Sequence, residues 1–355
     1  MKKLKLFLVL FLAIGLMASF AANTVTSVSS NGDETVLKFK VTDYDYKKVT
    51  TPKGNAIELV VPDTGKILKA GAPDLPRMAA SIIIPDKAKM KVEVIGTKFI
   101  EIKNVNIAPS KGNLLRTVDP KDVPYKFGEE YRTNAFFPKN LAQLAEPHII
   151  RNFRGQAVQV HPFRYNPVTR TLRVYTKIGV KVSNTGQTGK NILARTKKPN
   201  RLDRSFRPVY SGHFVNFSQV MSRYTFLDDA VGNMLIVSYG SFMDEMADFV
   251  SWKQQIGYSV DMVDYSTIGS ESALKTYVAN YYNTNGLTFL LLVGDHPQVP
   301  TSSTSAGDSD NNYGYIVGSD SYLDILVGRF SAETSAQVLT QVDRTIHYER
   351  DVFAT

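Results

Sequence analysis

The chain has 355 residues, 43% hydrophobic and 21% charged, with a formal net charge of +9. This composition is typical of a folded protein of one to three domains and excludes a disordered chain. The absence of cysteine excludes a disulfide framework and a thiol nucleophile within these residues.

The first 22 residues predict a signal peptide. Three lysines among the first five residues precede an apolar run over 6–17, and small residues that end at Ala22 follow it. The apolar run is shorter than the ~20 residues that a membrane-spanning helix needs, and no later segment qualifies. We therefore expect export, with no transmembrane segment after the signal is removed.

Residues 23–185 predict a β-rich domain. Short runs of alternating or β-branched apolar residues are separated by Pro, Gly and Asn turns. Strands are expected at 35–41, 56–61, 80–84, 91–95, 157–160 and 171–182. Residues 161–182 predict a two-stranded hairpin with an Asn-Pro turn. Many short strands without long helices are typical of a sandwich or barrel-like fold.

Residues 186–223 predict an exposed linker. They are basic and rich in turn-forming residues, and they show little periodicity, so proteases should cut them easily. Arg223, followed by Tyr224, ends this segment. On the residues alone, Arg223 is either a processing site or one basic residue among many.

From residue 224 onwards the pattern changes to alternating strands and helices. Strands are expected at 234–239, 259–263 and 288–293, and helices at 242–255, 270–282 and 333–348. A further apolar strand is expected to end at Phe330. This alternation predicts a mainly parallel sheet with helices packed on it, within an α/β domain over 224–355.

Charge is distributed unevenly along the chain. Residues 224–355 carry 5 Lys/Arg and 17 Asp/Glu, a balance of −12, whereas residues 1–223 carry 37 and 16, a balance of +21. A basic half can indicate nucleic-acid binding, but no RNA-binding motif or recognition-helix pattern is present. We therefore expect no nucleic-acid partner, and we predict that the two halves dock through complementary charge.

Asp295, Asp320 and Asp324 are candidate metal ligands. Asp295 is expected at the carboxyl end of a strand, where ligand sites of parallel sheets lie. Asp320, Tyr322 and Asp324 are spaced i, i+2, i+4, which places their side chains on one side if the segment is extended. Hard cations such as calcium take six to eight oxygen ligands from carboxylates and carbonyls. Acidic loops are also commonly just solvated, and the residues alone leave both interpretations open.

Residues 288–351 resemble the start of the catalytic domain of gingipains, which are secreted cysteine peptidases with a caspase-like fold. The similarity lies in LLLVGDH, in the SDxxYGxIVG pattern and in the GRFS and QxDRTIHYER runs, which match in order and spacing. Residues 161–182 resemble the C-terminal hairpin of gingipain prodomains, and the residues after Arg223 resemble the mature start of arginine-specific gingipains. The resemblance implies a prodomain over 23–185 and an incomplete caspase-like α/β domain over 224–355.

This resemblance also implies a function. The complete protein is expected to be a zymogen of a cysteine endopeptidase that cleaves protein substrates after arginine, and also after lysine in some members. It would reach the exterior or the cell surface of a bacterium through the periplasm. The prodomain would assist folding, pack on its own catalytic domain and keep the enzyme latent until cleavage between Arg223 and Tyr224.

No catalytic residue is expected within this chain. The histidine and the cysteine that would attack the peptide bond are expected beyond Thr355, so the chain by itself should be inactive. Latency in such an enzyme can come from a basic prodomain side chain that enters the specificity pocket. Lys126 and Arg132 are the candidates, because both lie near aromatic residues, although an exposed surface loop explains them equally well.

The resemblance further implies one structural calcium ion. Its ligands would be the carboxylates of Asp295, Asp320 and Asp324 and the main-chain carbonyls of Val317 and Tyr322. The family more often has glutamate where Asp324 stands, so this ligand has a shorter arm than usual.

Two non-enzymatic alternatives stay open on the sequence. A secreted inhibitor or decoy would be built from a prodomain and a degenerate enzyme fragment. A calcium-binding surface protein would bind calcium but would not be processed at Arg223.

Overall fold

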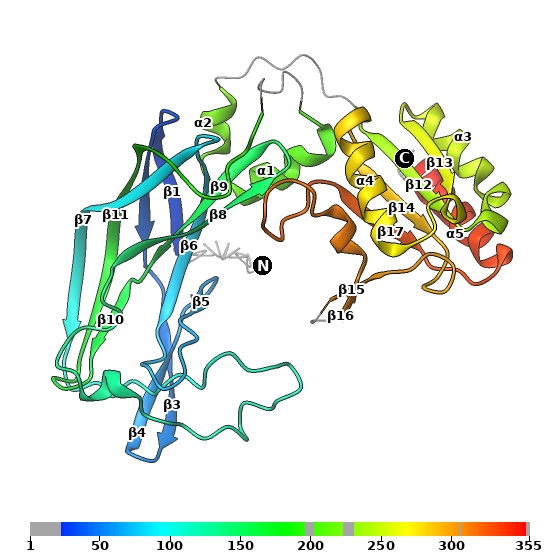
Figure 1. Ribbon diagram of the computed structural model, residues 1–355. Coiled ribbons are helices and arrows are strands. Elements are labelled where there is room, and N and C mark those ends of the chain that lie inside the picture. Colours follow the sequence, from blue (N-terminus) through cyan, green and yellow to red (C-terminus); the bar gives the residue numbers. More distant parts are fainter. Residues whose placement is uncertain (1–22, 196–201, 223–230, 305–306, 353–355) are drawn as a thin grey trace, which may run out of the picture.

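The computed structural model describes residues 23–195, 202–222, 231–304 and 307–352. These residues form a β-rich N-terminal part and an α/β C-terminal part (Figure 1). The predicted signal peptide and the predicted cleavage site between Arg223 and Tyr224 lie outside the described residues. No described helix is long and apolar enough to cross a membrane.

The N-terminal part is built on two antiparallel sheets. The first contains β1 (Thr24–Ser30), β2 (Glu34–Lys40), β11 (Thr171–Thr188), β10 (Phe163–Asn166) and β7 (Ala88–Ile102). The second contains β5 (Gly65–Lys66), β6 (Pro76–Ile83), β9 (Phe153–Val160) and β8 (Ala142–Ile150). A separate hairpin is formed by β3 (Asp45–Thr51) and β4 (Gly54–Val60).

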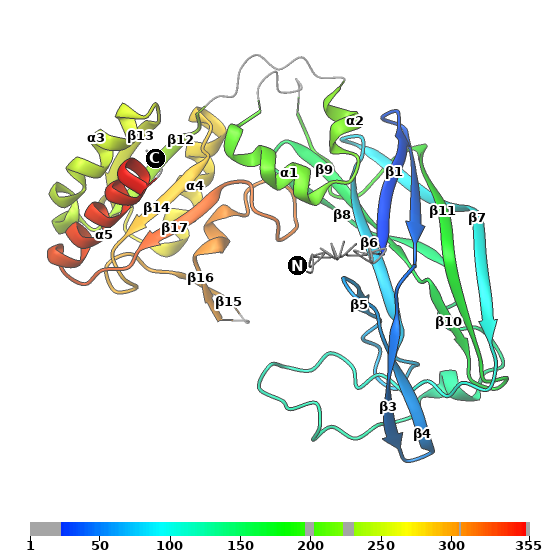
Figure 2. The same ribbon diagram turned by 180° about the vertical axis from the view of Figure 1, so that it is seen from behind.

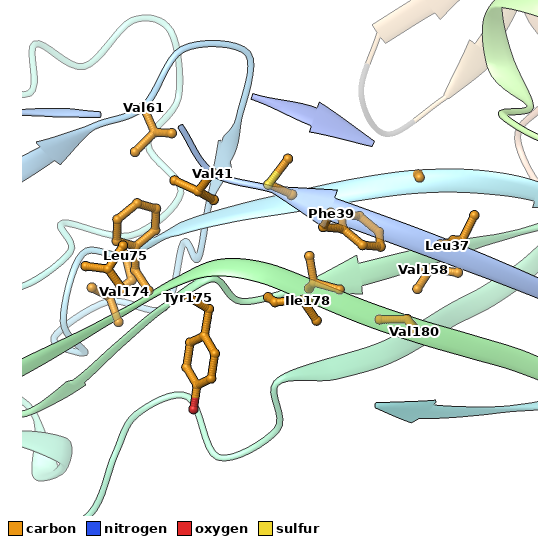
Figure 3. Close-up of a cluster of buried hydrophobic side chains, with 14 of the residues drawn as sticks. Leu37, Phe39, Val41, Val61, Leu75, Val158, Val174, Tyr175, Ile178 and Val180 are labelled. Atoms are coloured by element: carbon orange, nitrogen blue, oxygen red, sulfur yellow. The ribbon is translucent and has the colours of Figure 1, made fainter. Parts of the chain in front are cut away.

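The two sheets share one hydrophobic core, which confirms the predicted sandwich-like β fold. Leu37 and Phe39 alternate with polar residues along β2, and they pack with Ile178 of β11 against residues of the second sheet such as Val158 (Figure 3). This alternation with a period of two buries one face of each strand. Each fully buried Leu or Phe side chain contributes about 1.5–3 kcal/mol.

Residues 202–222 fold onto the second sheet, so the predicted exposed linker over 186–223 is wrong there. They contain α1 (Arg207–His213) and α2 (Phe217–Met221), while β11 extends to Thr188. The buried aromatic residues of this segment recur every three or four positions and pack on one cluster: Phe206, Tyr210, Phe214 and Phe217. This spacing is that of one helix face, and it is the signal that sequence reasoning missed.

The C-terminal part contains a four-stranded parallel sheet in the order β13-β12-β14-β17. Its strands are β12 (Asn233–Ser238), β13 (Ser259–Asp264), β14 (Phe289–Val293) and β17 (Leu326–Phe330). Its helices are α3 (Ala247–Gln255), α4 (Glu271–Asn285) and α5 (Ser335–His347). A small hairpin is formed by β15 (Ser302–Thr304) and β16 (Gly307–Ser309).

Helices cover both faces of this parallel sheet, as the alternating pattern predicts. On one face, Phe249 of α3 and Val338 of α5 pack with Ile236 of β12. On the other face, Leu274 and Val278 of α4 form a second cluster with buried residues of β12 and β14. The predicted mainly parallel α/β layer is therefore confirmed. The predicted helix over 242–255 is regular only from residue 247, because 3-10 turns precede it.

Candidate functional site at the junction of the two parts

The loop before β17 contacts the N-terminal part. We call residues 316–324 the junction loop. It lies beside α1 and the turn between β8 and β9 in both views, where it is drawn in orange (Figure 1 and Figure 2). Its backbone is bent rather than extended, so the condition under which Asp320, Tyr322 and Asp324 would share one side is not met.

Asp320 binds donors from both parts of the chain. Its Oδ2 accepts the backbone N–H of Ile149 at 2.8 Å and the Nδ2–H of Asn191 at 2.6 Å. Its Oδ1 accepts the N–H of Tyr322 at 2.9 Å within the loop. Asn191 also uses its Oδ1, which accepts the N–H of Ser319 at 3.0 Å. The two amide atoms of Asn191 are thus both engaged across the junction.

Asp324 is completely buried at the same junction. Its Oδ1 accepts the N–H of Arg151 at 2.9 Å, and its Oδ2 accepts the N–H groups of Ile316 and Val317 at 2.9 and 2.7 Å. Burial raises the pKa of the Asp324 carboxyl, and these three N–H donors oppose that rise. The carboxylate therefore depends on its donors to stay charged.

The guanidinium group of Arg151 contacts residues of the α/β part. Nη1 donates to the carbonyl oxygens of Leu287 and of Asp324, the latter at 2.9 Å, and Nη2 donates to Thr288 Oγ1 at 3.3 Å. Nη2 also lies 3.8 Å from Asp203 Oδ2. The Arg151 and Asp203 side chains are only 12% and 6% exposed, so solvent screens this pair weakly. One arginine thus joins the start of β14, the junction loop and the segment before α1.

A stack of rings covers the edge of the junction. His148 stacks on Tyr322 with ring centroids 4.2 Å apart, and its Nε2 lies 2.9 Å from Nε2 of His213. Burial lowers the pKa of His148 to about 4, with a further contribution from His213, and burial also lowers the pKa of His213. Both rings are therefore neutral at neutral pH, and one donates a hydrogen bond to the other.

Two family models match the chain. The propeptide model Propeptide_C25 covers residues 20–205, and the model of peptidase family C25 covers residues 228–355. The chain belongs to peptidase family C25. This is a family of cysteine endopeptidases, and the β-rich part and the α/β part are its propeptide part and its peptidase part. The junction described above is where these two parts meet.

Gingipains of Porphyromonas gingivalis are similar to most of the chain. Gingipain R1 is 40% identical over 330 residues, which cover 91% of this chain and 33% of that protein. Gingipain R2 of strain W83 is 37% identical over 334 residues, which cover 92% of this chain and 45% of that protein. The chain thus spans less than half the length of these relatives.

A solved structure of the family matches about half of the chain. It is described as a complex of P. gingivalis RgpB pro- and mature domains, and the match has a TM-score of 0.51 and 36% sequence identity. The match covers 55% of this chain and 97% of the solved chain.

The structure separates the predicted calcium ligands of this C25 chain. Asp295 follows the carboxyl end of β14, where its carboxylate accepts a hydrogen bond from Ser331 at 3.1 Å. Asp320 and Asp324 precede the amino end of β17, which runs parallel to β14 with Leu326 opposite Phe289. Because the strands are parallel, Asp295 lies at the opposite end of the sheet from the other two carboxylates.

The remaining predicted ligands do not fit a cation in this arrangement. The carboxylates of Asp320 and Asp324 accept N–H groups, and Val317 and Tyr322 supply two of these N–H groups. Within the described ranges, no group of three or more His, Asp or Glu side chains is placed to hold a metal ion.

The strand-end residues of β14 bind one another locally. Arg329 donates to the carbonyl oxygens of Gly294 and Val299 at 2.8 and 2.7 Å and pairs with Asp310 at 2.7 Å. His296 bonds Thr301 through Nδ1 at 3.0 Å and is exposed. These contacts shape the loop after β14.

The two predicted inhibitory residues of the propeptide part are exposed. Lys126 and Arg132 lie in the segment between β7 and β8, which reaches out from the two sheets in Figure 1. Arg132 ends a short 3-10 turn, Glu129–Arg132.

The sequence interpretation did not include Arg151 and Asn191 among the functional residues. Both adopt positive φ, 46° and 45°, but three other non-glycine residues within the described ranges do so as well, so residue type alone does not mark these two. Their partners in the peptidase part lie 128–173 positions away along the chain, so no local pattern marks them.

Proposed function

We propose that this chain is the propeptide and the first part of the peptidase domain of a secreted cysteine endopeptidase zymogen that cleaves after basic residues, arginine first. Membership of family C25 and the similarity to gingipains R1 and R2 support the enzyme class and the preference for arginine. The observation that carries the packing of the propeptide on the peptidase part is the buried Arg151 junction between them. The chain has no cysteine, so these residues alone do not hydrolyse peptides.

Activation begins, in this proposal, with a cut after Arg223. This residue lies between the propeptide match, which ends at 205, and the peptidase match, which begins at 228. Incubating the chain with an arginine-specific peptidase should produce a fragment whose N-terminal residue is Tyr224, as read by mass spectrometry. Arg223→Gln should abolish that fragment, whereas Arg207→Gln, a change at the exposed start of α1, should leave it. Cutting only elsewhere would contradict the proposal.

Latency comes, in this proposal, from a basic side chain of the segment between β7 and β8. The full chain should inhibit an active R-type gingipain added in trans, and either Lys126→Ala or Arg132→Ala should raise the inhibition constant about tenfold or more. Lys121→Ala, in the same exposed segment, is the matched control. If neither variant changes the inhibition constant, both residues are eliminated as inhibitory groups.

A further inference from the structure

The outer face of the first sheet carries lysines that stand opposite one another. Lys177 of β11 is paired with Lys98 of β7 on one side and with Lys40 of β2 on the other. The next residue of β11, Ile178, is buried in the core, so Lys177 and its partners lie on the solvent-facing side of the sheet. Lys38, two positions before Lys40, lies on the same face. We call these four residues the lysine cluster: Lys38, Lys40, Lys98 and Lys177.

The lysine cluster is electrostatically unfavourable in the chain alone. Like charges directly opposite each other on neighbouring strands destabilise a sheet. Elsewhere on the same face the charge is balanced, because Lys181 lies 3.3 Å from Glu93 and 4.0 Å from Glu34. In the part of the chain that the structure describes, no carboxylate forms an ion pair with a lysine of the cluster. The cluster therefore offers four unneutralised positive charges to an anionic ligand.

A shallow apolar hollow lies beside the lysine cluster. Gly96 of β7 and Gly179 of β11 are paired here, and a Cβ on Gly96 would meet no atom within 4 Å. Ile95, which a β-bulge leaves unpaired, lies along Gly179, because a Cβ on that glycine would be 3.3 Å from Ile95 Cγ1. Ile95 and Val28, which both line the hollow, are 54% and 59% exposed. Exposed aliphatic side chains and unneutralised lysines thus occur together on this face.

This face is directed away from the peptidase part. In both views the sheet that contains β7 and β11 lies farther from the peptidase part than the sheet that contains β8 and β9 (Figure 1 and Figure 2). The hydrophobic core lies between the two sheets. The junction contacts come from the turn between β8 and β9 and from the segment after β11. The acidic peptidase part of the same molecule therefore does not cover the lysine cluster.

We propose that the outer face of the first sheet binds the anionic headgroups of a lipid membrane. Proteins bind such a surface through two contributions: the attraction of Lys and Arg to anionic lipids, and the entry of apolar side chains into the headgroup layer. The lysine cluster supplies the first contribution, and Ile95 and Val28 supply the second. Bound in this way, the chain keeps its peptidase part on the side away from the membrane.

Other anionic partners fit this face less well. Single-stranded nucleic acids bind through basic grooves in which bases stack on aromatic rings. The aromatic residue beside Lys98 is Phe99, and the Arg173 guanidinium already lies over its ring at 4.6 Å from the centroid. A second copy of the chain docked through the same face would bring lysines against lysines. A lipid surface requires neither a free aromatic ring nor a complementary protein shape.

Vesicle binding tests the proposal on the chain without residues 1–22, so that the predicted signal peptide does not contribute. This protein should cosediment with vesicles of equimolar phosphatidylcholine and phosphatidylglycerol but not with vesicles of phosphatidylcholine alone. The double variant Lys98→Gln/Lys177→Gln should bind the anionic vesicles about tenfold more weakly, because each lysine near an anionic surface strengthens binding several-fold. Ile95→Ser should weaken binding about threefold through the loss of apolar contact.

A matched control removes the same charge elsewhere. Lys47 and Lys48 are exposed on β3, and Lys47→Gln/Lys48→Gln should leave vesicle binding within about twofold of the wild type at physiological salt. Thermal unfolding followed by circular dichroism then separates ligand binding from a structural role. Lys98→Gln/Lys177→Gln should unfold at the same temperature as the wild type or higher, because the substitutions remove like-charge repulsion.

Three results would each overturn the proposal. Equal binding of the wild type and Lys98→Gln/Lys177→Gln to anionic vesicles would show that the lysine cluster is not the contact. Binding to a single-stranded oligonucleotide without binding to vesicles would assign the face to a nucleic acid. A lower unfolding temperature of Lys98→Gln/Lys177→Gln would show that the lysines stabilise the sheet itself.

Discussion

At the residue scale, Arg151 joins the two parts because its backbone and its side chain both donate to the peptidase part. Its φ of 46° lies in the left-handed region, which costs a non-glycine residue about 1–2 kcal/mol. In this conformation its N–H reaches Asp324, while the guanidinium group reaches Leu287 and Thr288. A strained residue with so many partners is more consistent with a functional contact than with an ordinary turn.

Replacing Arg151 should weaken the docking of the two parts. Arg151→Ala removes the guanidinium donors to two buried carbonyls and the cation beside Asp203, and we expect a loss of about 2–3 kcal/mol in docking free energy. The dissociation constant of the chain cut within 196–201 measures this loss. Lys190→Ala is the control, because the Lys190–Glu146 pair is exposed (79% and 75%) and should contribute under about 0.5 kcal/mol. Equal dissociation constants for the two variants would contradict the role of Arg151.

His161 should make the propeptide part sensitive to acid. Burial lowers the pKa of His161, two arginines lower it further, and the Asn140 carbonyl, which lies 2.9 Å from Nδ1, opposes this. The unfolded chain therefore binds a proton before the folded chain does. The free energy of unfolding should fall as pH drops below about 6.5, by at most about 1.4 kcal/mol per pH unit.

Denaturation followed by circular dichroism at several pH values checks this dependence. His161→Gln should flatten the slope between pH 7 and 5, whereas His296→Gln, at an exposed position, should not change it. His148 and His213 contribute slopes of the same sign, so the difference between variants is the informative quantity. An unchanged slope in His161→Gln would show that His161 does not titrate differently in the two states.

At the element scale, α1 and α2 are stable only because they pack on the second sheet. Helices of seven and five residues are too short to persist alone in water. Asn216, between them, is fully buried and bonds both backbone atoms of Ile83, at 2.8 Å to N–H and 3.0 Å to the carbonyl. The Asn216 amide thus gives the backbone N–H and carbonyl of Ile83, at the outer edge of β6, their hydrogen-bond partners.

Phe214 should carry much of the stability of this element. The ring is 2% exposed and contacts Phe153 and His148. Phe214→Ala should lower the free energy of unfolding of the propeptide part by about 3–5 kcal/mol in chemical denaturation. Val209→Ala, on the exposed side of α1, should change it by less than about 0.5 kcal/mol. If Phe214→Ala changes the free energy of unfolding only slightly, residues 202–222 behave as a linker and not as a packed element.

At the scale of the whole molecule, opposite charge brings the two parts together and the buried junction holds them. The balance of +21 in residues 1–223 against −12 in residues 224–355 acts over long range. The junction adds apolar contact, since Leu326 of β17 packs against the cluster formed by α1 and α2. Association and dissociation should therefore respond differently to salt.

Salt should slow association of the separated parts more than it speeds their dissociation. Raising NaCl from about 0.1 M to about 1 M shortens the screening length from ~10 Å to ~3 Å. We expect the association rate constant to fall about tenfold or more, with a smaller change in the dissociation rate constant, in surface plasmon resonance. A salt-independent association rate would show that the charge asymmetry plays no part in docking.

Much of the fold could be predicted because its signals are local. Strands such as β2 and β14 and helices such as α4 and α5 follow from hydrophobic periodicity and caps; Ser270 and Thr334 accept N–H bonds at the starts of α4 and α5. Residues 202–222 contain two opposing local signals. Their basic, turn-rich composition indicates a linker, whereas the spacing of their aromatic residues indicates the helices α1 and α2, and only the structure shows that the second signal is the correct one.

The sequence by itself determined the order of elements, the two-part organisation and the opposite charges, since each depends on neighbouring residues or on simple sums. Only the tertiary structure decided how the acidic residues are used. Because β14 and β17 are parallel, Asp295, which follows β14, lies at one end of the sheet, and Asp320 and Asp324, which precede β17, lie at the other. Docking then gives those two carboxylates partners from Ile149, Arg151 and Asn191. Contacts between residues so distant in the chain depend on how whole sheets pack, which local patterns do not encode.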